Sequence, residues 1–177
     1  MAYLIDTDIF IGAKNLHYGM DFCPAFWGWL VAANTAGTVL SIDAVRDDLL
    51  NGADELAAWA AERGDGFFLS PQATDLTALG RVTQWINDHR TYSPAAKQTF
   101  LGCSDYFVVS QALAGGHIVV THEKPENSVH RIKIPSVCVA MNVKCMTCWQ
   151  MLRAERARFV LEGSAGGSAG PRRRSIA

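Results

Sequence analysis

The chain has 177 residues, of which 49% are hydrophobic and 19% are charged, so it can form one domain with a buried core. Its 16 Lys and Arg residues face 17 Asp and Glu residues, and the net charge of −1 excludes a protein that binds nucleic acid through bulk basic charge alone. The longest apolar run, residues 26–33, is far shorter than the roughly 20 residues of a membrane-spanning helix. No basic leader precedes the acid at residue 6, so the sequence predicts a cytoplasmic protein without a membrane span.

Strand-like and helix-like segments alternate along the chain. Short apolar runs predict strands at 3–6, 37–42, 67–69 and 117–121, and a last edge strand drawn from 131–134 and 137–140. Helical periodicity and start signals predict helices at 26–34, 43–50, 53–63, 71–89, 104–114 and 148–161. We expect two of these helices to be capped by Asp43 and Ser104, and the helix at 71–89 to bury Leu76, Leu79, Val82 and Ile86. This alternation is typical of an α/β fold with a central, mainly parallel sheet and right-handed crossovers.

The cysteines do not indicate a disulfide framework, because their number is odd and they are scattered at 23, 103, 138, 145 and 148. Cys145 and Cys148 form a lone CxxC pair, and no second pair stands at the spacing that a zinc site needs. We interpret them as buried thiols of the C-terminal helix rather than as a metal or redox site.

The last residues differ in composition from the rest of the chain. Residues 163–177 are rich in Gly, Ser and Ala and carry an arginine run at 172–174, as a flexible linker with a basic end would. We place the domain at 1–162 and a flexible tail at 163–177. Because these three arginines are the tail's only charges, residues 1–162 retain 13 Lys and Arg against 17 Asp and Glu, and this part is acidic. The run is interpreted as a solvated or appended tail, with contact to RNA as the alternative.

Four acids stand at the ends of predicted strands or the starts of predicted helices, namely Asp6, Asp48, Asp105 and Glu123. Ligands of parallel α/β sheets bind beyond the carboxyl ends of the strands, so we expect these side chains to converge. Converging carboxylates repel each other unless a cation neutralises them or some stay protonated. Oxygen ligands without thiolate or imidazole select Mg²⁺ or Mn²⁺, and a carboxylate-bound metal can activate water for phosphodiester cleavage. The pattern therefore favours metal-assisted phosphoryl hydrolysis.

Each acid also has a purely structural interpretation. Asp6 can cap the turn that follows it, Asp48 and Asp105 can interact with a helix dipole, and Glu123 can be a loop acid balanced by its neighbour Lys124. For Asp8 we favour the structural interpretation, as a turn or cap residue, over a role as a metal ligand.

Four short segments have the order and spacing of a known nuclease fold. Residues 4–10 contain Ile-Asp-Thr-Asp, residues 41–49 end in Val-Arg-Asp-Asp-Leu, residues 104–112 begin with Ser-Asp, and residues 119–123 read Val-Val-Thr-His-Glu. Together they resemble the PIN domain, the fold of VapC-like toxins in bacterial toxin–antitoxin pairs. Segments 18–29 and 133–138 are similar to a largely uncharacterised PIN-like subfamily of bacterial proteins. The resemblance covers about residues 2–160.

The resemblance implies a three-layer α/β/α sandwich and a Mg²⁺- or Mn²⁺-dependent endoribonuclease. It makes Asp6, Asp48, Asp105 and Glu123 the metal-binding and catalytic acids, and it sets the hydroxyl of Thr121 beside them. It also implies an RNA substrate, a homodimer and a cognate antitoxin that inserts into the active-site groove. Two positions depart from the usual motifs, because Asp48 stands where glutamate is usual and Glu123 where aspartate is usual.

Further residues have two interpretations each. The Trp residues at 27, 29, 59, 85 and 149 can stack on bases, but their apolar neighbours favour packing in the core or in a dimer. His122, between Thr121 and Glu123, can contact a phosphate. Five basic residues can line a groove that draws RNA to an acidic protein, or can each be solvated surface: Lys14, Lys97, Lys124, Arg131 and Lys133.

Two other functions remain open on the sequence alone. The altered second and fourth acids are compatible with a PIN-like protein that binds RNA or a partner without cleaving. Asp6-Thr-Asp8 after a strand also imitates the opening of the haloacid-dehalogenase phosphatases, in which the first aspartate is the nucleophile. That family expects Thr or Val at the position of Phe10, and no later Lys and Asp-Asp motif is present.

Overall fold

Short apolar runs form the strands of one parallel sheet in the computed structural model, which describes residues 1–160. The strands are β1 (Tyr3–Ile5), β2 (Val39–Ile42), β3 (Phe68–Leu69), β4 (Ile118–Val120) and β5 (Cys145–Met146), in the spatial order β3-β2-β1-β4-β5. All four pairings are parallel, so the predicted α/β class with a parallel sheet is confirmed. The predicted tail, 163–177, and the domain boundary at 162 lie outside the described residues.

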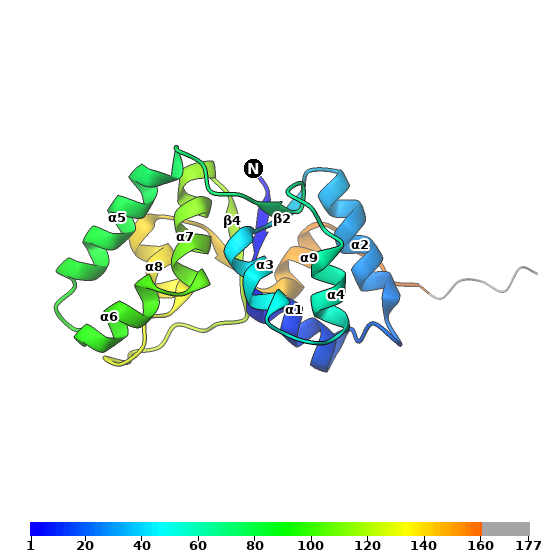
Figure 1. The fold of residues 1–177 in the computed structure, drawn as a ribbon, viewed down its shortest axis with the longest axis horizontal. Coiled ribbons are helices and arrows are strands. Elements are labelled where there is room, and N and C mark those ends of the chain that lie inside the picture. Colours follow the sequence, from blue (N-terminus) through cyan, green and yellow to red (C-terminus); the bar gives the residue numbers. More distant parts are fainter. Residues whose placement is uncertain (161–177) are drawn as a thin grey trace, which may run out of the picture.

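Helices cover both faces of this sheet (Figure 1). In the described residues these are α1 (Thr7–Gly12), the π-helical η1 (Ala13–His17), α2 (Pro24–Thr35), α3 (Asp43–Leu50), α4 (Glu55–Ala61), α5 (Asp75–Asp88), α6 (Pro94–Leu101), α7 (Ser104–Gly115), α8 (Ile134–Met141) and α9 (Cys148–Ala154). Figure 1 shows α5, α7 and α8 on one side of the strands and α2, α4 and α9 on the other, so the molecule is a three-layer α/β/α sandwich.

The strand order reverses direction next to β1, in the middle of the sheet. The chain runs outward from β1 to β2 and β3, then returns through α5, α6 and α7 to β4 on the other side of β1. Tyr3 is therefore in register with Val39 on one side and with Ile118 on the other. Such a reversal is the point where open α/β sheets bind their ligands, beyond the carboxyl ends of the two strands.

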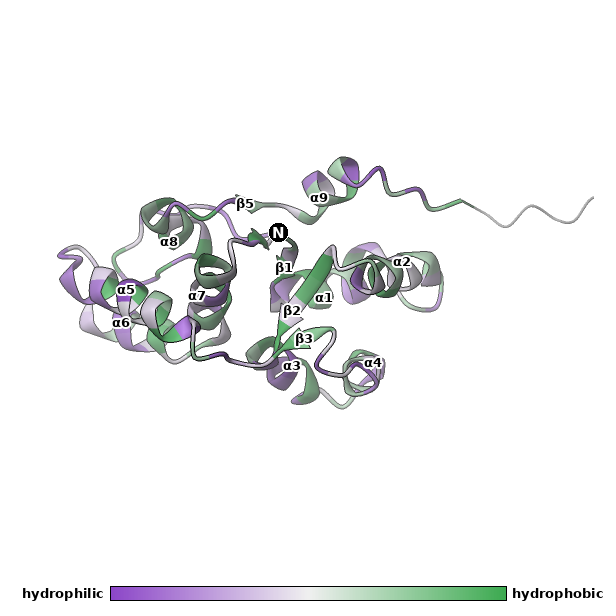
Figure 2. Cartoon of the chain, turned by 90° about the horizontal axis from the view of Figure 1, so that it is seen from above, coloured by the Kyte–Doolittle hydropathy of each residue, from purple (hydrophilic) through white to green (hydrophobic). Residues whose placement is uncertain are grey.

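The core consists of aromatic and aliphatic side chains from the strands and from the helices that cover the sheet. Phe10, Phe26 and Phe68 are completely buried, and the rings of Phe10 and Trp59 lie 5.7 Å apart. In the hydropathy colours of Figure 2, β2 and β3 are green, as strands buried on both faces should be. The predicted burial of the tryptophans holds for Trp27 and Trp59, whereas Trp149 is 40% exposed.

The predicted last edge strand is wrong. Residues 134–141 form the helix α8, and the edge strand is β5, where the sequence analysis predicted no strand. The β-branched residues of this run favour a strand, but Pro135 stands in the first turn, where a helix tolerates its missing N–H and a sheet ladder does not. Asn142, with φ of 56°, then ends the helix in a left-handed conformation.

Other differences concern helix ends. Helix α6 was not predicted, although Ser93 caps it and Pro94 opens it. Asp43 and Ser104 are the first residues of their helices and not their caps, and α9 ends at residue 154 rather than 161. In α5 the buried stripe is Asp75, Ala78, Val82 and Ile86, whereas Leu76 is 69% exposed.

The structure also bears on the cysteines and on membrane-spanning helices. All five cysteines are free thiols; Cys148 is buried at the start of α9, and Cys145 lies in β5 rather than in the helix. Burial raises the pKa of Cys148 to about 12, so it is protonated at neutral pH. No helix within residues 1–160 has both the length and the apolar character for crossing a membrane.

Candidate active site

Asp6 lies at the carboxyl end of β1, where the strand order reverses. Its backbone N–H donates to the carbonyl of Val120 on β4 (3.0 Å), which ties the two central strands together at their ends. Its carboxylate caps α1 by accepting a hydrogen bond from the N–H of Thr7 (2.7 Å). Asp6 is only 2% exposed, so the first predicted acid is buried at the point where the strand order reverses.

Thr121 joins two carboxylates. Its Oγ1 lies 2.9 Å from Oδ2 of Asp6 and 3.0 Å from Oδ2 of Asp8, and it accepts a hydrogen bond from the N–H of Glu123 (3.1 Å). Because a hydroxyl carries one proton, it donates to only one of the two carboxylates at a time. The backbone N–H of His122 donates to Asp8 as well (2.9 Å). Asp8, which the sequence analysis interpreted as a turn or cap residue, therefore belongs to the acidic site, and Asp6 is the cap.

Asp105 completes the buried part of the site from α7. Its pKa is raised to about 6, chiefly by burial and next by the charge of Glu123, with Lys133 acting in the opposite direction. Asp8 and Asp48 raise the pKa of Asp105 further. The pKa of Asp6 is raised well above its usual value by burial, then by Asp8 and by Asp105. Acids from four separate segments thus lie close enough to affect one another.

Two of the predicted acids lie at the rim and already have partners. Asp48 is exposed on α3 and accepts a hydrogen bond from the hydroxyl of Thr7 (3.0 Å). Glu123 forms an ion pair with Lys133 through Oε1, and its Oε2 accepts from the N–H of Ile134 at the start of α8 (2.8 Å). Both oxygens of Glu123 are engaged, which follows from its length: a glutamate after β4 reaches across the loop to α8.

The four predicted acids interact electrostatically, but two of them, Asp48 and Glu123, are hydrogen-bonded to other groups. Within residues 1–160, no three His, Cys, Asp or Glu side chains stand close enough to share a metal ion. Asp48 is held at Thr7 and Glu123 at Lys133, which leaves Asp6, Asp8 and Asp105 as the inner acids.

The inner acids nevertheless fit a hard divalent cation. None of the ion pairs among the described residues involves Asp6, Asp8 or Asp105. Burial, which is nearly complete for Asp6 and partial for Asp8 and Asp105, raises the pKa values of all three acids. Buried carboxylates without a cationic partner gain most from a bound cation, and their oxygens are the ligands that Mg²⁺ and Mn²⁺ prefer. Mg²⁺ is commonly held by one or two carboxylates and several waters, so a cage of three side chains is not required.

A pocket of about 220 Å³ opens beside Asp105 and Glu123. Helix α6 forms one wall, and the loop before α8 forms the other with His130, Arg131 and Lys133. Two of the five basic residues predicted to line a groove are therefore found here. Lys14 instead pairs with Asp54 (2.6 Å), and Lys97 donates to the carbonyl of Asn87. A pocket with acids at one end and cations along one wall is suited to a phosphate group placed next to the acids.

Comparison with known proteins identifies a family but no activity. A family model described as "Domain of unknown function (DUF4411)" matches residues 3–159, so the chain belongs to this family. No curated protein matches the chain, and no solved structure does.

Proposed function

We propose that this member of the DUF4411 family is a metal-dependent endoribonuclease that binds Mg²⁺ or Mn²⁺ at Asp6 and Asp105. The observation that carries the proposal is the pair Asp6 and Asp8 at the topological switch point, which share the hydroxyl of Thr121 and, among the described residues, form no ion pair with a lysine or arginine. A structural acid at this depth would be expected to have a lysine or arginine beside it. Acids that are buried, unpaired and close together are instead typical of a functional site.

The chain's own residues hold and orient the groups that the reaction needs. A bound Mg²⁺ or Mn²⁺ supplies activation of water and stabilisation of the leaving oxygen in phosphodiester hydrolysis. Asp6 and Asp105 are the candidate ligands, with Asp8 and Asp48 acting directly or through water. The hydroxyl of Thr121 orients Asp6, and the N–H of His122 orients Asp8. Glu123 forms an ion pair with Lys133 and thereby holds the lysine ammonium group at the rim of the site, next to Asp105.

RNA must reach this site through local charge, because residues 1–162 are acidic as a whole. The pocket beside Asp105 offers Arg131, Lys133 and His130 for a phosphate of the strand. Contacts to phosphates set the position of the strand but carry no sequence information. We therefore propose that this pocket aligns the backbone, and that it does so for RNA of any sequence.

The PIN resemblance supplies the rest of the proposal. It implies products with a 3′-hydroxyl and a 5′-phosphate. It also implies that the protein is the toxin of a bacterial type II toxin–antitoxin system, works as a homodimer in the cytoplasm and is inhibited by a cognate antitoxin. The order of the four motifs, which brings Asp6, Asp105 and Thr121 to one edge of the sheet, supports this assignment.

A PIN-like protein that binds RNA or a partner without cleaving is the second candidate. One observation favours it: Glu123, the fourth acid of the motif set, is tied to Lys133 and to the start of α8. A protein that had lost its metal could use such a lysine to neutralise the remaining acids. The two candidates differ in whether any divalent metal produces cleavage.

The test is cleavage of a mixed cellular RNA pool by the purified chain in Mg²⁺, in Mn²⁺ and in EDTA. We expect discrete fragments that require metal and that disappear in Asp6→Asn. Asp54→Asn is the matched control, because Asp54 also caps a helix but lies outside the acidic site. Binding without cleavage in any metal would favour the second candidate. Equal cleavage by Asp6→Asn would show that the site has been placed wrongly or that a contaminating nuclease is present.

A further inference from the structure

A second pocket, of about 500 Å³, lies at the end of α9 and is lined by aromatic and basic side chains. Its lining is Tyr18, Trp149, Leu152, Arg153, Arg156, Ala157, Arg158 and Phe159. Trp149 is 40% exposed, the only tryptophan of the described residues with that degree of exposure. An exposed tryptophan on a pocket wall is unusual for a residue that gains so much from burial, so its position needs a reason.

The aromatic wall of the pocket is anchored in the core. Tyr18 stacks on the fully buried Phe26, with ring centroids 4.3 Å apart and planes 10° from parallel. Phe159 packs edge-on against both rings, at 5.8 Å and 6.0 Å. Rings held in this way lose little freedom when a ligand binds, which favours affinity.

The charges of the pocket are all positive. Arg153, Arg156 and Arg158 lie within six residues of one another in a chain whose described part is otherwise acidic. Glu155, the acid among them, does not line the pocket and instead accepts a hydrogen bond from the hydroxyl of Tyr3 on β1 (2.8 Å). Arg156 has a φ of 52°, a left-handed conformation that glycine or asparagine usually takes. The pocket thus keeps an arginine where backbone conformation alone would favour another residue.

His122 connects this pocket to the acids. Its backbone N–H donates to Asp8, and its ring lies 4.5 Å from that of Trp149. His17 packs against both, 5.4 Å from Trp149 and 5.9 Å from His122. Asp8, His122 and Trp149 are therefore consecutive contacts between the acidic site and the pocket. The pocket near Asp105 borders the acids separately, through Asp105 and Glu123.

We propose that the pocket at the end of α9 is a nucleotide subsite, in which a base of single-stranded RNA stacks on Trp149 while Arg153, Arg156 and Arg158 bind its phosphates. This proposal rests on the proposed function, since it takes RNA as the ligand. Stacking on an aromatic ring tolerates any base, and arginines bind phosphates of any sequence. The subsite therefore adds affinity and strand direction without a sequence requirement.

The test measures binding in EDTA, where no cleavage is expected, on the full chain. Quenching of tryptophan fluorescence by a short oligouridine should be strong in the wild type and largely absent in Trp149→Phe, which keeps a ring for folding. Trp149→Ala should weaken oligouridine binding by about tenfold, the range seen for loss of one base–aromatic stack. Trp85→Phe, on α5, is the matched control and should keep the quenching.

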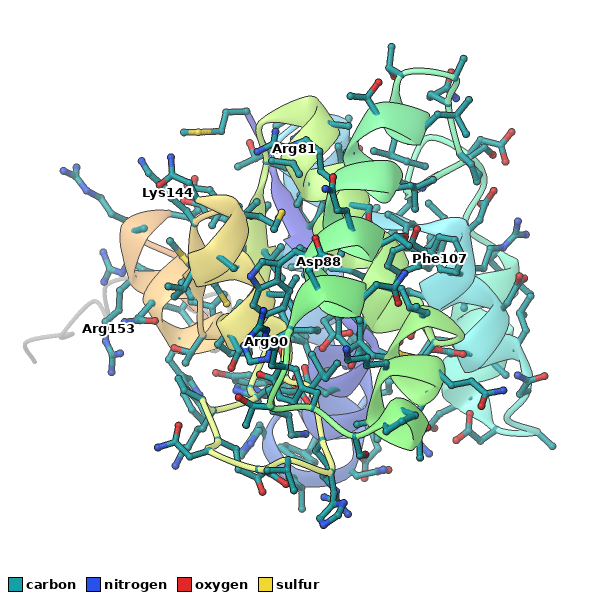
Figure 3. All side chains as sticks on the ribbon, turned by 90° about the vertical axis from the view of Figure 1, so that its left-hand side faces the viewer. Arg81, Asp88, Arg90, Phe107, Lys144 and Arg153 are labelled. Atoms are coloured by element: carbon teal, nitrogen blue, oxygen red, sulfur yellow. The ribbon has the colours of Figure 1, made fainter. Side chains whose placement is uncertain are left out.

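The arginines have a matched control too. Figure 3 shows Arg81 on α5, well apart from Arg153 on α9. Arg153→Glu should weaken oligouridine binding by about tenfold, and Arg81→Glu, a change of the same net charge at an exposed site, should leave it within twofold. Inorganic polyphosphate, which has no bases, should compete at the arginines but should not reproduce the change in Trp149 fluorescence.

The outcomes separate this inference from the proposed function. Oligouridine binding that is unaffected in Trp149→Ala and Arg153→Glu would overturn the subsite even if the protein cleaves RNA. Binding that depends on Trp149 and Arg153 in a protein that never cleaves would support the subsite and overturn only the nuclease. Arg81→Glu weakening binding as much as Arg153→Glu would mean that net charge alone attracts RNA, and it would also overturn the subsite.

Discussion

Asp6 and Asp54 have the same local role and opposite electrostatics. Both are aspartates at the N-caps of short helices, Asp6 bonded to the N–H of Thr7 and Asp54 to the N–H groups of Leu56 and Ala57. Asp54 is exposed and pairs with Lys14, and this partner lowers its pKa. Asp6 is buried next to Asp8 and Asp105, and its pKa is raised. The cap motif therefore does not reveal which acid is functional; burial and the charge of distant neighbours do.

The difference has an energetic meaning. A cap such as Asp54 stabilises its helix, and its lysine favours the charged form. Burial and the neighbouring acids disfavour the charged form of Asp6, so its ionisation opposes folding, whereas the ionisation of Asp54 favours folding. A protein keeps such an arrangement where the charge is used, for example to bind a cation. The predictions below test this contrast from the largest expected effect to the smallest.

The most direct test of this contrast removes the negative charge from the acids of the site and from Asp54. Asp6→Asn and Asp105→Asn should each lower metal-dependent RNA cleavage by about a hundredfold or more, the scale of losing a main electrostatic contributor to the transition state. Asp54→Asn should cleave within about twofold of the wild type, because asparagine is as good a cap as aspartate. Initial rates on one mapped RNA fragment provide the measurement. A similar loss in all three variants would mean that the effect is on folding and not on the site.

The pH dependence of stability should have opposite signs at the two kinds of site. Asp105 binds its proton more tightly in the folded state, with a pKa of about 6 against the ordinary 3.8. The folded state therefore holds more protons between these values, and without metal its stability falls as pH rises from about 4 to about 6. The loss should be on the order of 3 kcal/mol, since the pKa rises by about two units and one unit corresponds to about 1.4 kcal/mol.

Urea unfolding in EDTA at several pH values measures this slope, with Asp105→Asn as the comparison. The variant should show a flatter profile across the same window and should be more stable than the wild type at pH 7. A saturating divalent metal should also flatten the wild-type profile, because it stabilises the charged form. An unchanged profile in Asp105→Asn would exclude Asp105 as the titrating group. For Asp54, whose pKa is lowered, the stabilising contribution should be lost as pH falls.

Much of this architecture was predictable because it depends on local signals. Short apolar runs predicted four of the five strands, and the resemblance to the PIN motifs placed Thr121 beside Asp6. What could not be predicted depends on contacts across the fold. In the sequence, Asp8 resembles any acid in the first turn of a helix. Its hydrogen-bond partners, Thr121 and the N–H of His122, directly follow β4 and are more than 100 residues away in the chain.

Glu123 shows the same limit over a shorter distance. Its partners, Lys133 and the start of α8, lie only about ten residues on, but the loop between them has no regular structure. The strand predicted over 131–134 and 137–140 offers no helix N-terminus to a carboxylate, whereas α8 offers the N–H of Ile134. Recognising Pro135 as a helix-start signal would have indicated the partner.

Two lysine–carboxylate pairs allow a further comparison. Lys133 and Glu123 lie at the rim of the acidic site, and Lys14 and Asp54 lie outside it. In each, the carboxylate also accepts a backbone N–H at the start of a helix: Asp54 at α4 and Glu123 at α8. Lys133→Met should release a carboxylate beside Asp105 and remove a competing cation, so Mn²⁺ should bind about tenfold more tightly. Lys14→Met should leave Mn²⁺ affinity unchanged. Calorimetric titration of both variants decides this, and weaker Mn²⁺ binding in Lys133→Met would show that the lysine supports the metal site.

The smallest effect is expected at Asp54 itself. Asp54→Ala removes the hydrogen bonds to Leu56 and Ala57 and the partner of Lys14, so α4 loses its cap. Loss of an N-cap in a chain of this size should lower the melting temperature by about 2–4 °C. RNA cleavage at 25 °C should not change, because most of the protein stays folded and Asp54 contributes nothing to the acidic site. If Asp54→Ala instead lowered cleavage as strongly as Asp6→Asn, the distinction between a cap that stabilises the fold and a cap that serves the site would have to be abandoned.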